Sequence, residues 1–303
     1  MKISFSIFTM FMFIGCQSST IQFDENSAFN WLEDQCEFGP RNPGSKGYFD
    51  CKEFLIKNLT EYSDTVFTQN FTYTELRENK TYDLSNIIAE FNVNSEKHIL
   101  LGAHWDTRPW ADKDLDPSNH STPIVGANDG ASGVAILMEL AKIFNSSRPP
   151  VNITLVLFDG EDLGVDGVLN SYAQGSQYFG KNLPIETPDY GIILDMVGDR
   201  ILDIPIERNS YRVAPELVND LWNIAEKLKL PAFQNRLGYD VYDDHIPLWE
   251  FAGIPAIDLI DLNYPNQRVN YWHTVNDIPQ NCSPESLGQI GRVLTNYIYS
   301  LTP

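Results

Sequence analysis

The sequence is poor in histidine, cysteine and basic residues. Its 303 residues include five His and four Cys, and 21 Lys and Arg stand against 41 Asp and Glu, a formal net charge of −20. This shortage of basic residues argues against a nucleic-acid partner, because such a partner needs Lys and Arg to neutralise its phosphates. The cysteines have neither C-x-x-C spacing nor a neighbouring histidine, so neither a cysteine zinc site nor a thiol nucleophile is indicated.

The N-terminal segment has the pattern of an export signal. Lys2 precedes a short apolar run that ends in Gly15 and Cys16. The run would form about 18 Å of helix against a hydrocarbon core of roughly 30 Å, so it is too short to span a bilayer. Gly15-Cys16 resembles a bacterial lipobox, although Phe stands where Leu is usual and cleavage without a lipid stays open. We expect residues 1–16 to be a signal segment and the protein to be exported to the periplasm or cell envelope, anchored by lipid on Cys16.

The remaining chain predicts one domain behind a short tether. Residues 17–30 are polar and are expected to form the tether, and residues 31–303 are enough for one catalytic domain with a single sizeable core. An export compartment permits disulfides, and Cys36 with Cys51 is the nearest pair in sequence. We expect the protein to be a monomer.

Short apolar runs alternate with segments of helical spacing. This alternation predicts an α/β fold with a central, mostly parallel mixed sheet and helices on both faces, because the runs are apolar almost throughout. The predicted strands are 85–91, 98–103, 153–158, 190–194 and 254–260, and the predicted helices are 130–144, 215–228 and 284–301, with further helical pieces within 29–60 and a long loop at 108–128. In such a fold, ligands bind beyond the carboxyl ends of the strands.

Polar side chains stand at these strand ends. His104 and Asp106 form an H-x-D unit after the second strand, and His104 is a candidate metal ligand. Asp129 stands at the entry to a predicted helix, where an N-cap is the more usual role for an aspartate. Glu161 and Asp162 directly follow the third strand. Such a pair can divide into a metal ligand and a general base, and a solvated turn is the equal alternative.

The second half of the chain supplies further candidate ligands. Asp195 ends the fourth strand, His245 lies in the segment DDHIP, and His273 lies in YWHT. Where no suitable thiol is present, zinc prefers imidazole nitrogen and carboxylate oxygen, and a catalytic site keeps one position open. A set of two carboxylates and one imidazole is therefore chemically sensible.

The order of these motifs resembles the zinc aminopeptidase-like family, most closely its glutaminyl-peptide cyclotransferase branch. The match runs from about Phe38 to the C-terminus and comprises H-x-D, the D-x-A-S-G-type helix entry, the acidic pair, D-M-V-G, D-H-x-P and H-T. The resemblance implies one catalytic zinc per chain, bound by Asp129, Asp162 and His273, with Glu161 as general acid/base. Asp162 stands where many members of the family carry Glu.

Within the family, several residues favour the cyclases over the aminopeptidases. Asp243 stands where dizinc aminopeptidases usually carry Ser, Trp272 precedes the last motif, and HWDTRPWADKD at 104–114 resembles the bacterial cyclases. The resemblance implies that Asp195 and Asp243 are catalytic, sharing protons or holding the substrate amine. Trp272 would form an apolar wall for the substrate, with a plain core aromatic as the alternative. His245 would support a carboxylate.

The implied activity is that of an acyltransferase. It converts N-terminal glutamine of peptides and proteins to pyroglutamate and releases ammonia. The segment after Asp162 lacks the Trp of animal cyclases, which leaves the substrate contacts there open. His104 and Asp195 match the second-metal positions of aminopeptidases, so residue identity alone does not fix the number of metals. The alternatives are a zinc aminopeptidase of the same fold and a catalytically inactive binding module.

Overall fold

The computed structural model describes residues 21–302, so the signal segment, Cys16 and the start of the expected tether lie outside the described residues. The tether prediction for 17–30 is wrong at its end, because helix α1 (Glu25–Glu37) already belongs to the domain. Asp24 caps this helix by accepting hydrogen bonds from the amides of Asn26 and Ser27, each at 3.0 Å. Ala28 is fully buried, because α1 packs against α3 and α8. The helix was not predicted from residue 25 because most of its side chains are polar and only one narrow face is buried.

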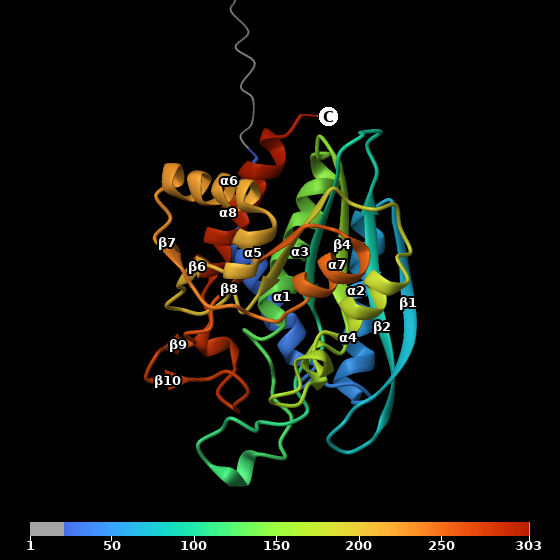
Figure 1. The fold of residues 1–303 in the computed structure, drawn as a ribbon, viewed down its shortest axis with the longest axis vertical. Coiled ribbons are helices and arrows are strands. Elements are labelled where there is room, and N and C mark those ends of the chain that lie inside the picture. The colour runs from blue at the N-terminus through green and yellow to red at the C-terminus, as the bar shows by residue number, and fades with distance from the viewer. Residues whose placement is uncertain (1–20, 303) are drawn as a thin grey trace, which may run out of the picture.

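The centre of the molecule is a six-stranded mixed sheet (Figure 1). Its order is β1-β2-β4-β3-β5-β8; β1, β2 and β4 pair antiparallel, whereas β4, β3, β5 and β8 run parallel. The strands are β1 (Thr65–Thr74), β2 (Thr81–Phe91), β3 (His98–His104), β4 (Asn152–Phe158), β5 (Tyr190–Asp195) and β8 (Ala256–Ile260). The predicted α/β class is confirmed, and β1 is an edge strand that was not predicted.

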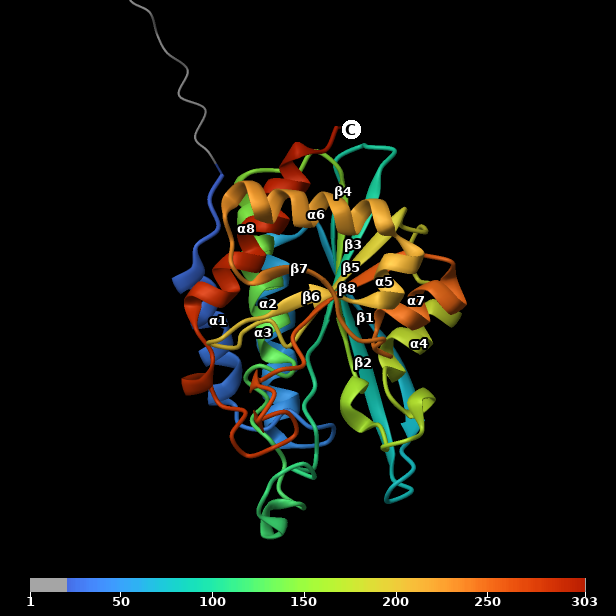
Figure 2. The same cartoon turned by 60° about the vertical axis from the view of Figure 1, so that its left-hand side comes forward.

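Helices cover both faces of this sheet (Figure 2). One face is covered by α1, α2 (Lys46–Tyr62), α3 (Ala131–Ser146), α6 (Pro215–Leu228) and α8 (Pro284–Ser300). The other is covered by the short helices α4 (Gln174–Lys181) and α7 (His245–Ala252). Leu100 and Leu101 show why the strands are apolar throughout: they are neighbours in β3, both fully buried, and belong to the cores on opposite faces. Burial of each such side chain contributes about 1.5–3 kcal/mol.

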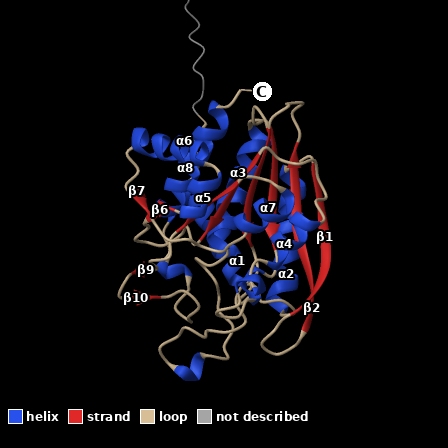
Figure 3. Ribbon diagram, viewed as in Figure 1, coloured by secondary structure: helices blue, strands red, loops and turns tan. Residues whose placement is uncertain are grey.

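Smaller elements connect the layers (Figure 3). They are α5 (Arg208–Val213), the strand pairs β6 (Ile204–Ile206) with β7 (Phe233–Leu237) and β9 (Pro265–Asn266) with β10 (Val269–Asn270), and the 3-10 helices η1 (Pro117–Asn119), η2 (Glu161–Leu163), η3 (Leu169–Ser171) and η4 (Pro279–Asn281). Within residues 21–302, no helix is long and apolar enough to cross a membrane.

The cysteines of the described chain are free thiols. Cys36, Cys51 and Cys282 form no disulfide with one another, so the pairing of Cys36 with Cys51 is not found. Burial raises the pKa of both Cys36 and Cys51 to about 12. These two thiols are therefore inert at neutral pH.

Candidate active site

The candidate site lies where the four parallel strands end. Because β3, β4, β5 and β8 run in one direction, the loops that follow them meet at one edge of the sheet. A cavity of ≈ 380 Å³ opens there, and apolar residues such as Leu169, Val241 and Leu262 share its wall with the polar ones. Its lining includes the catalytic, substrate-binding and metal-binding residues that the resemblance implies, namely Asp129, Glu161, Asp162, Asp195, Asp243, Trp272 and His273, but not the candidate ligand His104.

Three buried side chains from three different loops converge at the cavity floor. His273 Nε2 lies 2.9 Å from Asp162 Oδ1 and 3.5 Å from Asp129 Oδ2. One ligand atom from each of the three residues lies within 4.8 Å of the others. Asp129 Oδ2 and Asp162 Oδ2 are buried and accept no hydrogen bond from the described residues. Two carboxylates and one imidazole with unpartnered buried oxygens suit a zinc ion that keeps a position open.

Asp129 does not cap the helix that follows it. The N-cap of α3 is Gly130, and no side chain caps this end. The Asp129 carboxylate instead faces His104 and His273. The main chain here is fixed by Asp277, whose carboxylate accepts the amides of Asn128 at 2.8 Å and Asp129 at 3.1 Å. Sequence reasoning missed Asp277, because its partners lie far away in the chain.

Glu161 and Asp162 are held by one carboxylate. Asp106, the acidic residue of the H-x-D unit, faces the amide of Glu161 at 3.2 Å and that of Asp162 at 3.3 Å. Gly160 enters this turn with φ +70°, a conformation that favours glycine. The turn is thus buried and fixed, and the alternative of a solvated turn is wrong.

The environments of Glu161 and Asp162 move their pKa values apart. Burial, followed by the charge of Asp162, raises the pKa of Glu161 well above its usual value. Burial alone would raise the pKa of Asp162 too, but His273 and then Arg108 lower it to about 2. Asp162 is therefore kept ionised, whereas its neighbour Glu161 takes up a proton readily. Two carboxyl groups with separated pKa values are typical of a general acid/base residue beside a charged partner.

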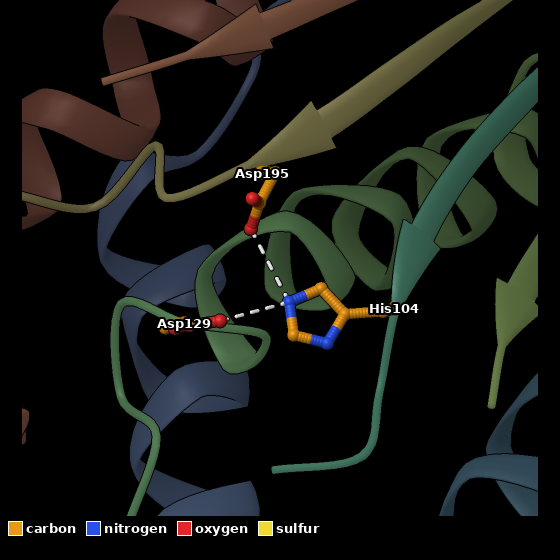
Figure 4. A group of neighbouring side chains, drawn as sticks. All are labelled: His104, Asp129 and Asp195. Atoms are coloured by element: carbon orange, nitrogen blue, oxygen red, sulfur yellow. Dashed lines mark hydrogen bonds and ion pairs between the residues drawn. The ribbon is translucent and has the colours of Figure 1, made fainter. Parts of the chain in front are cut away.

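His104 joins Asp129 to the end of β5 (Figure 4). Its Nε2 lies 3.1 Å from Asp129 Oδ1 and 3.2 Å from Asp195 Oδ1. Burial alone would lower the pKa of His104, but the carboxylates of Asp106, Asp129 and Asp195 raise it well above its usual value. His104, Asp129 and Asp195 also have metal-ligand spacing, since one ligand atom from each lies within 4.8 Å of the others.

Asp243 lies in a second buried group of charged side chains. Burial, followed by the charge of Asp195, raises the pKa of Asp243 to about 6. Behind Asp243, His245 Nε2 lies 3.4 Å from Glu207 Oε2, and His245 Nδ1 lies 3.8 Å from Asp258 Oδ2. His245 therefore lies beside carboxylates, as expected from the sequence. Glu207 and Asp258 were missed from the sequence.

Trp272 forms part of the cavity wall. Its ring stacks on His273 with centroids 3.7 Å apart and an interplanar angle of 28°. The side chain is half-buried and lines the cavity, so it is not a plain core aromatic. Contact with a substrate stays a prediction.

Comparison with known proteins gives consistent results. The model of peptidase family M28 matches residues 86–298. The glutaminyl cyclase of Bacteroides thetaiotaomicron bound to N-acetylhistamine is 34% identical, with a TM-score of 0.88 over 93% of this chain and 99% of that one. A zinc-dependent exopeptidase from Parabacteroides distasonis is equally similar, at 34% identity and a TM-score of 0.88 over 92% of this chain and 99% of that one. The glutaminyl-peptide cyclotransferase-like protein of Bos taurus is 24% identical over 85% of this chain and 71% of its own length.

The chain belongs to peptidase family M28, since the family model matches more than half of its length. The resemblance inferred from the motif order is thereby confirmed. Within that family, the similarity to glutaminyl cyclases extends over nearly the whole chain.

Proposed function

We propose that this protein is a zinc-dependent glutaminyl-peptide cyclotransferase. It converts N-terminal glutamine of peptides and proteins to pyroglutamate with release of ammonia. The observation that carries this assignment is Asp243, which stands where dizinc aminopeptidases usually carry Ser and lines the same cavity as Glu161 and the metal cluster. Similarity to bacterial glutaminyl cyclases over 93% of the chain supports the same activity.

Asp129, Asp162 and His273 would hold the zinc ion, one per chain. Their buried, unpartnered oxygens and the chemistry of the donor set support this assignment. When bound, zinc supplies a Lewis acid that polarises the side-chain carbonyl of the substrate glutamine. We propose a single ion on the resemblance to the cyclases, although His104, Asp129 and Asp195 form a second group with metal-ligand spacing.

Glu161 would transfer the protons. Cyclisation requires a base that accepts a proton from the attacking α-amine and an acid that gives one to the departing ammonia. One carboxylate with a raised pKa performs both transfers in turn, and burial gives Glu161 such a pKa. No covalent enzyme intermediate is required.

Asp195 and Asp243 would hold the substrate α-amine. Both carboxylates line the cavity, and burial, followed by the charge of Asp195, raises the pKa of Asp243 to about 6. An ammonium group between them relieves the repulsion between the two carboxylates, so the pair favours a free N-terminus. Trp272 would pack against the glutamine side chain as an apolar wall.

A zinc aminopeptidase is the second candidate. The equal similarity to a zinc-dependent exopeptidase favours it, and His104 with Asp195 stands at the second-metal positions of such enzymes. One assay separates the two: the cyclase releases ammonia from a glutaminyl peptide, chelation abolishes this release and added zinc restores it. Cleavage of a leucyl arylamide without ammonia release would identify an aminopeptidase.

Export and lipid anchoring belong to the same proposal. The short apolar run before Gly15-Cys16 supports attachment to a membrane through lipid on Cys16 in the periplasm or cell envelope. The monomeric state stays a prediction.

A further inference from the structure

Arg108, which is buried, and Asp112, which is partly exposed, form an ion pair on the loop that follows β3. Arg108 Nε donates to Asp112 Oδ1 at 2.7 Å, and Nη2 donates to Asp112 Oδ2 at 2.8 Å. The Arg108 side chain is 1% exposed and that of Asp112 is 20% exposed. Two parallel hydrogen bonds fix the plane of the carboxylate as well as its position. None of the catalytic roles proposed above uses either residue.

The same guanidinium also holds the turn that carries Asp162. Arg108 Nη1 donates to the main-chain oxygens of Asp162 at 3.0 Å and Gly164 at 3.1 Å. It lies 3.6 Å from Asp162 Oδ1. Arg108 therefore links Asp112 to one of the three proposed zinc ligands.

Asp112 faces a second proposed ligand, His273. Asp112 Oδ1 lies 3.9 Å from His273 Nδ1. This nitrogen is buried and makes no hydrogen bond with the described residues. Since Nε2 of the same ring points to Asp162 and Asp129, Nδ1 carries the proton whenever Nε2 binds a metal. A buried N–H group needs an acceptor, and a movement of about 1 Å would bring Asp112 to hydrogen-bond distance.

The main chain of His273 is held by the same loop. His273 has φ +57°, a left-handed conformation that few residues other than glycine adopt. The amide of Lys113, next to Asp112, donates to His273 O at 3.1 Å. A strained conformation of this kind persists only where neighbouring contacts fix it. The loop thus fixes both the backbone and the ring of His273.

We propose that Arg108 and Asp112 are positioning residues for the zinc site. Asp112 accepts a hydrogen bond from the Nδ1–H group of His273, which leaves the Nε2 lone pair for the metal. Arg108 holds Asp112 and the turn that carries Asp162 in place. The inference rests on the proposed function, because it takes Asp162 and His273 as zinc ligands. Carboxylates that orient a metal-binding imidazole typically change metal affinity about 10–100-fold when they are replaced.

The test is the zinc affinity of Asp112→Asn in otherwise intact mature protein, measured by competition with a chromophoric chelator. We expect binding weakened about 10–100-fold and a shifted visible spectrum of the cobalt-substituted protein. The metal-free melting temperature should also fall, because the buried Arg108 loses its counter-charge, so zinc affinity is measured at a temperature where both proteins are folded. Asp112→Glu should recover part of the affinity. The matched control is Asp116→Asn, which removes an exposed carboxylate of the same loop that accepts the Ser118 amide at 2.9 Å.

Unchanged zinc affinity and an unchanged cobalt spectrum in Asp112→Asn would overturn the proposal. An equal loss of zinc affinity in Asp116→Asn would also overturn it, because the effect would then come from general destabilisation of the loop and not from the contact between Asp112 and His273. At saturating zinc, kcat of Asp112→Asn should return to within a few-fold of the parent, whereas a catalytic role would lower kcat at unchanged affinity. If the parent releases no ammonia from glutaminyl peptides, the proposed function fails, but the zinc affinities still decide the role of Asp112.

Discussion

Asp162 Oδ1 lies 2.9 Å from His273 Nε2, although the two residues come from loops after different strands. Both side chains are about 1% exposed. An ionised carboxylate beside an imidazole in a buried place is costly unless further partners compensate it. Asp162 meets this requirement only in part, since one of its oxygens is buried without a hydrogen bond from the described residues. A cation bound between Asp162 and His273 would supply the missing partner for the buried carboxylate oxygen.

Replacing Asp162 should therefore lower the zinc content of the protein. In Asp162→Asn the ligand loses its charge, and we expect the purified protein to contain far less than one equivalent of zinc under conditions that saturate the parent. Metal analysis after gel filtration in metal-free buffer measures this. Full zinc content in the variant would show that another residue binds the ion.

Replacing Glu161 should instead lower the turnover rate and leave zinc binding intact. Glu161→Gln keeps the shape of the side chain but cannot transfer a proton, so turnover should fall by about two to four orders of magnitude. Zinc content should stay near that of the parent, and both quantities must be measured on the same preparation. Loss of zinc in Glu161→Gln together with its retention in Asp162→Asn would mean that the two roles are exchanged.

The lipid anchor is tested at Cys16. Lipidation needs this thiol, so Cys16→Ala should turn a membrane-associated protein into an uncleaved precursor or a soluble protein. Fractionation of cells into membrane and soluble parts, with the mass of the mature protein, gives the result. The same fractionation and processing in variant and parent would contradict lipid attachment.

The stability of the domain should depend on pH through Asp261, which lies just beyond β8. Burial raises the pKa of Asp261 from 3.8 to about 7, and its two oxygens accept the amides of Asp203 and Asn263, each at 2.8 Å. A carboxyl with a raised folded-state pKa holds its proton more tightly when folded. Its contribution to stability is therefore complete below about pH 4 and is lost as pH rises through about 7.

The variant Asp261→Asn removes this titration. One amide loses its acceptor, so the variant should be less stable than the parent at pH 4 by about 1–3 kcal/mol. The deficit should shrink as pH rises to 8, because only the parent then carries a buried charge. Chemical unfolding of both proteins across this range measures the difference, and a constant deficit would contradict the raised pKa.

The sequence predicted the core of the fold because the central strands are apolar on both faces. The strand expected at 153–158 is β4 (Asn152–Phe158), and the helix expected at 215–228 is α6 with the same bounds. Strand β1 was missed, because it has few apolar residues, and these neither alternate strictly nor become fully buried at the sheet edge. Helix α7 was missed because it is short and contains Pro247 near its start.

The candidate site was predicted from motif order, and its geometry was not. Glu161 and Asp162 could be named from their position after a buried strand, whereas nothing periodic marks Asp277, which fixes the Asp129 backbone from the far end of the chain. Arg108 and Asp112 lie in the segment 104–114 that resembles the bacterial cyclases, but their pairing was not predicted, since an ion pair within a loop follows no helical or strand repeat. Residues that support a site through long-range contacts become visible only in the folded chain.

The most direct test of the account combines product and metal analysis of the mature protein. With a glutaminyl peptide as substrate, we predict one ammonia released per pyroglutamyl peptide formed, one tightly bound zinc per chain, and no cleavage of a leucyl arylamide. Two tightly bound metals together with release of free amino acid and no ammonia would contradict it and identify an aminopeptidase.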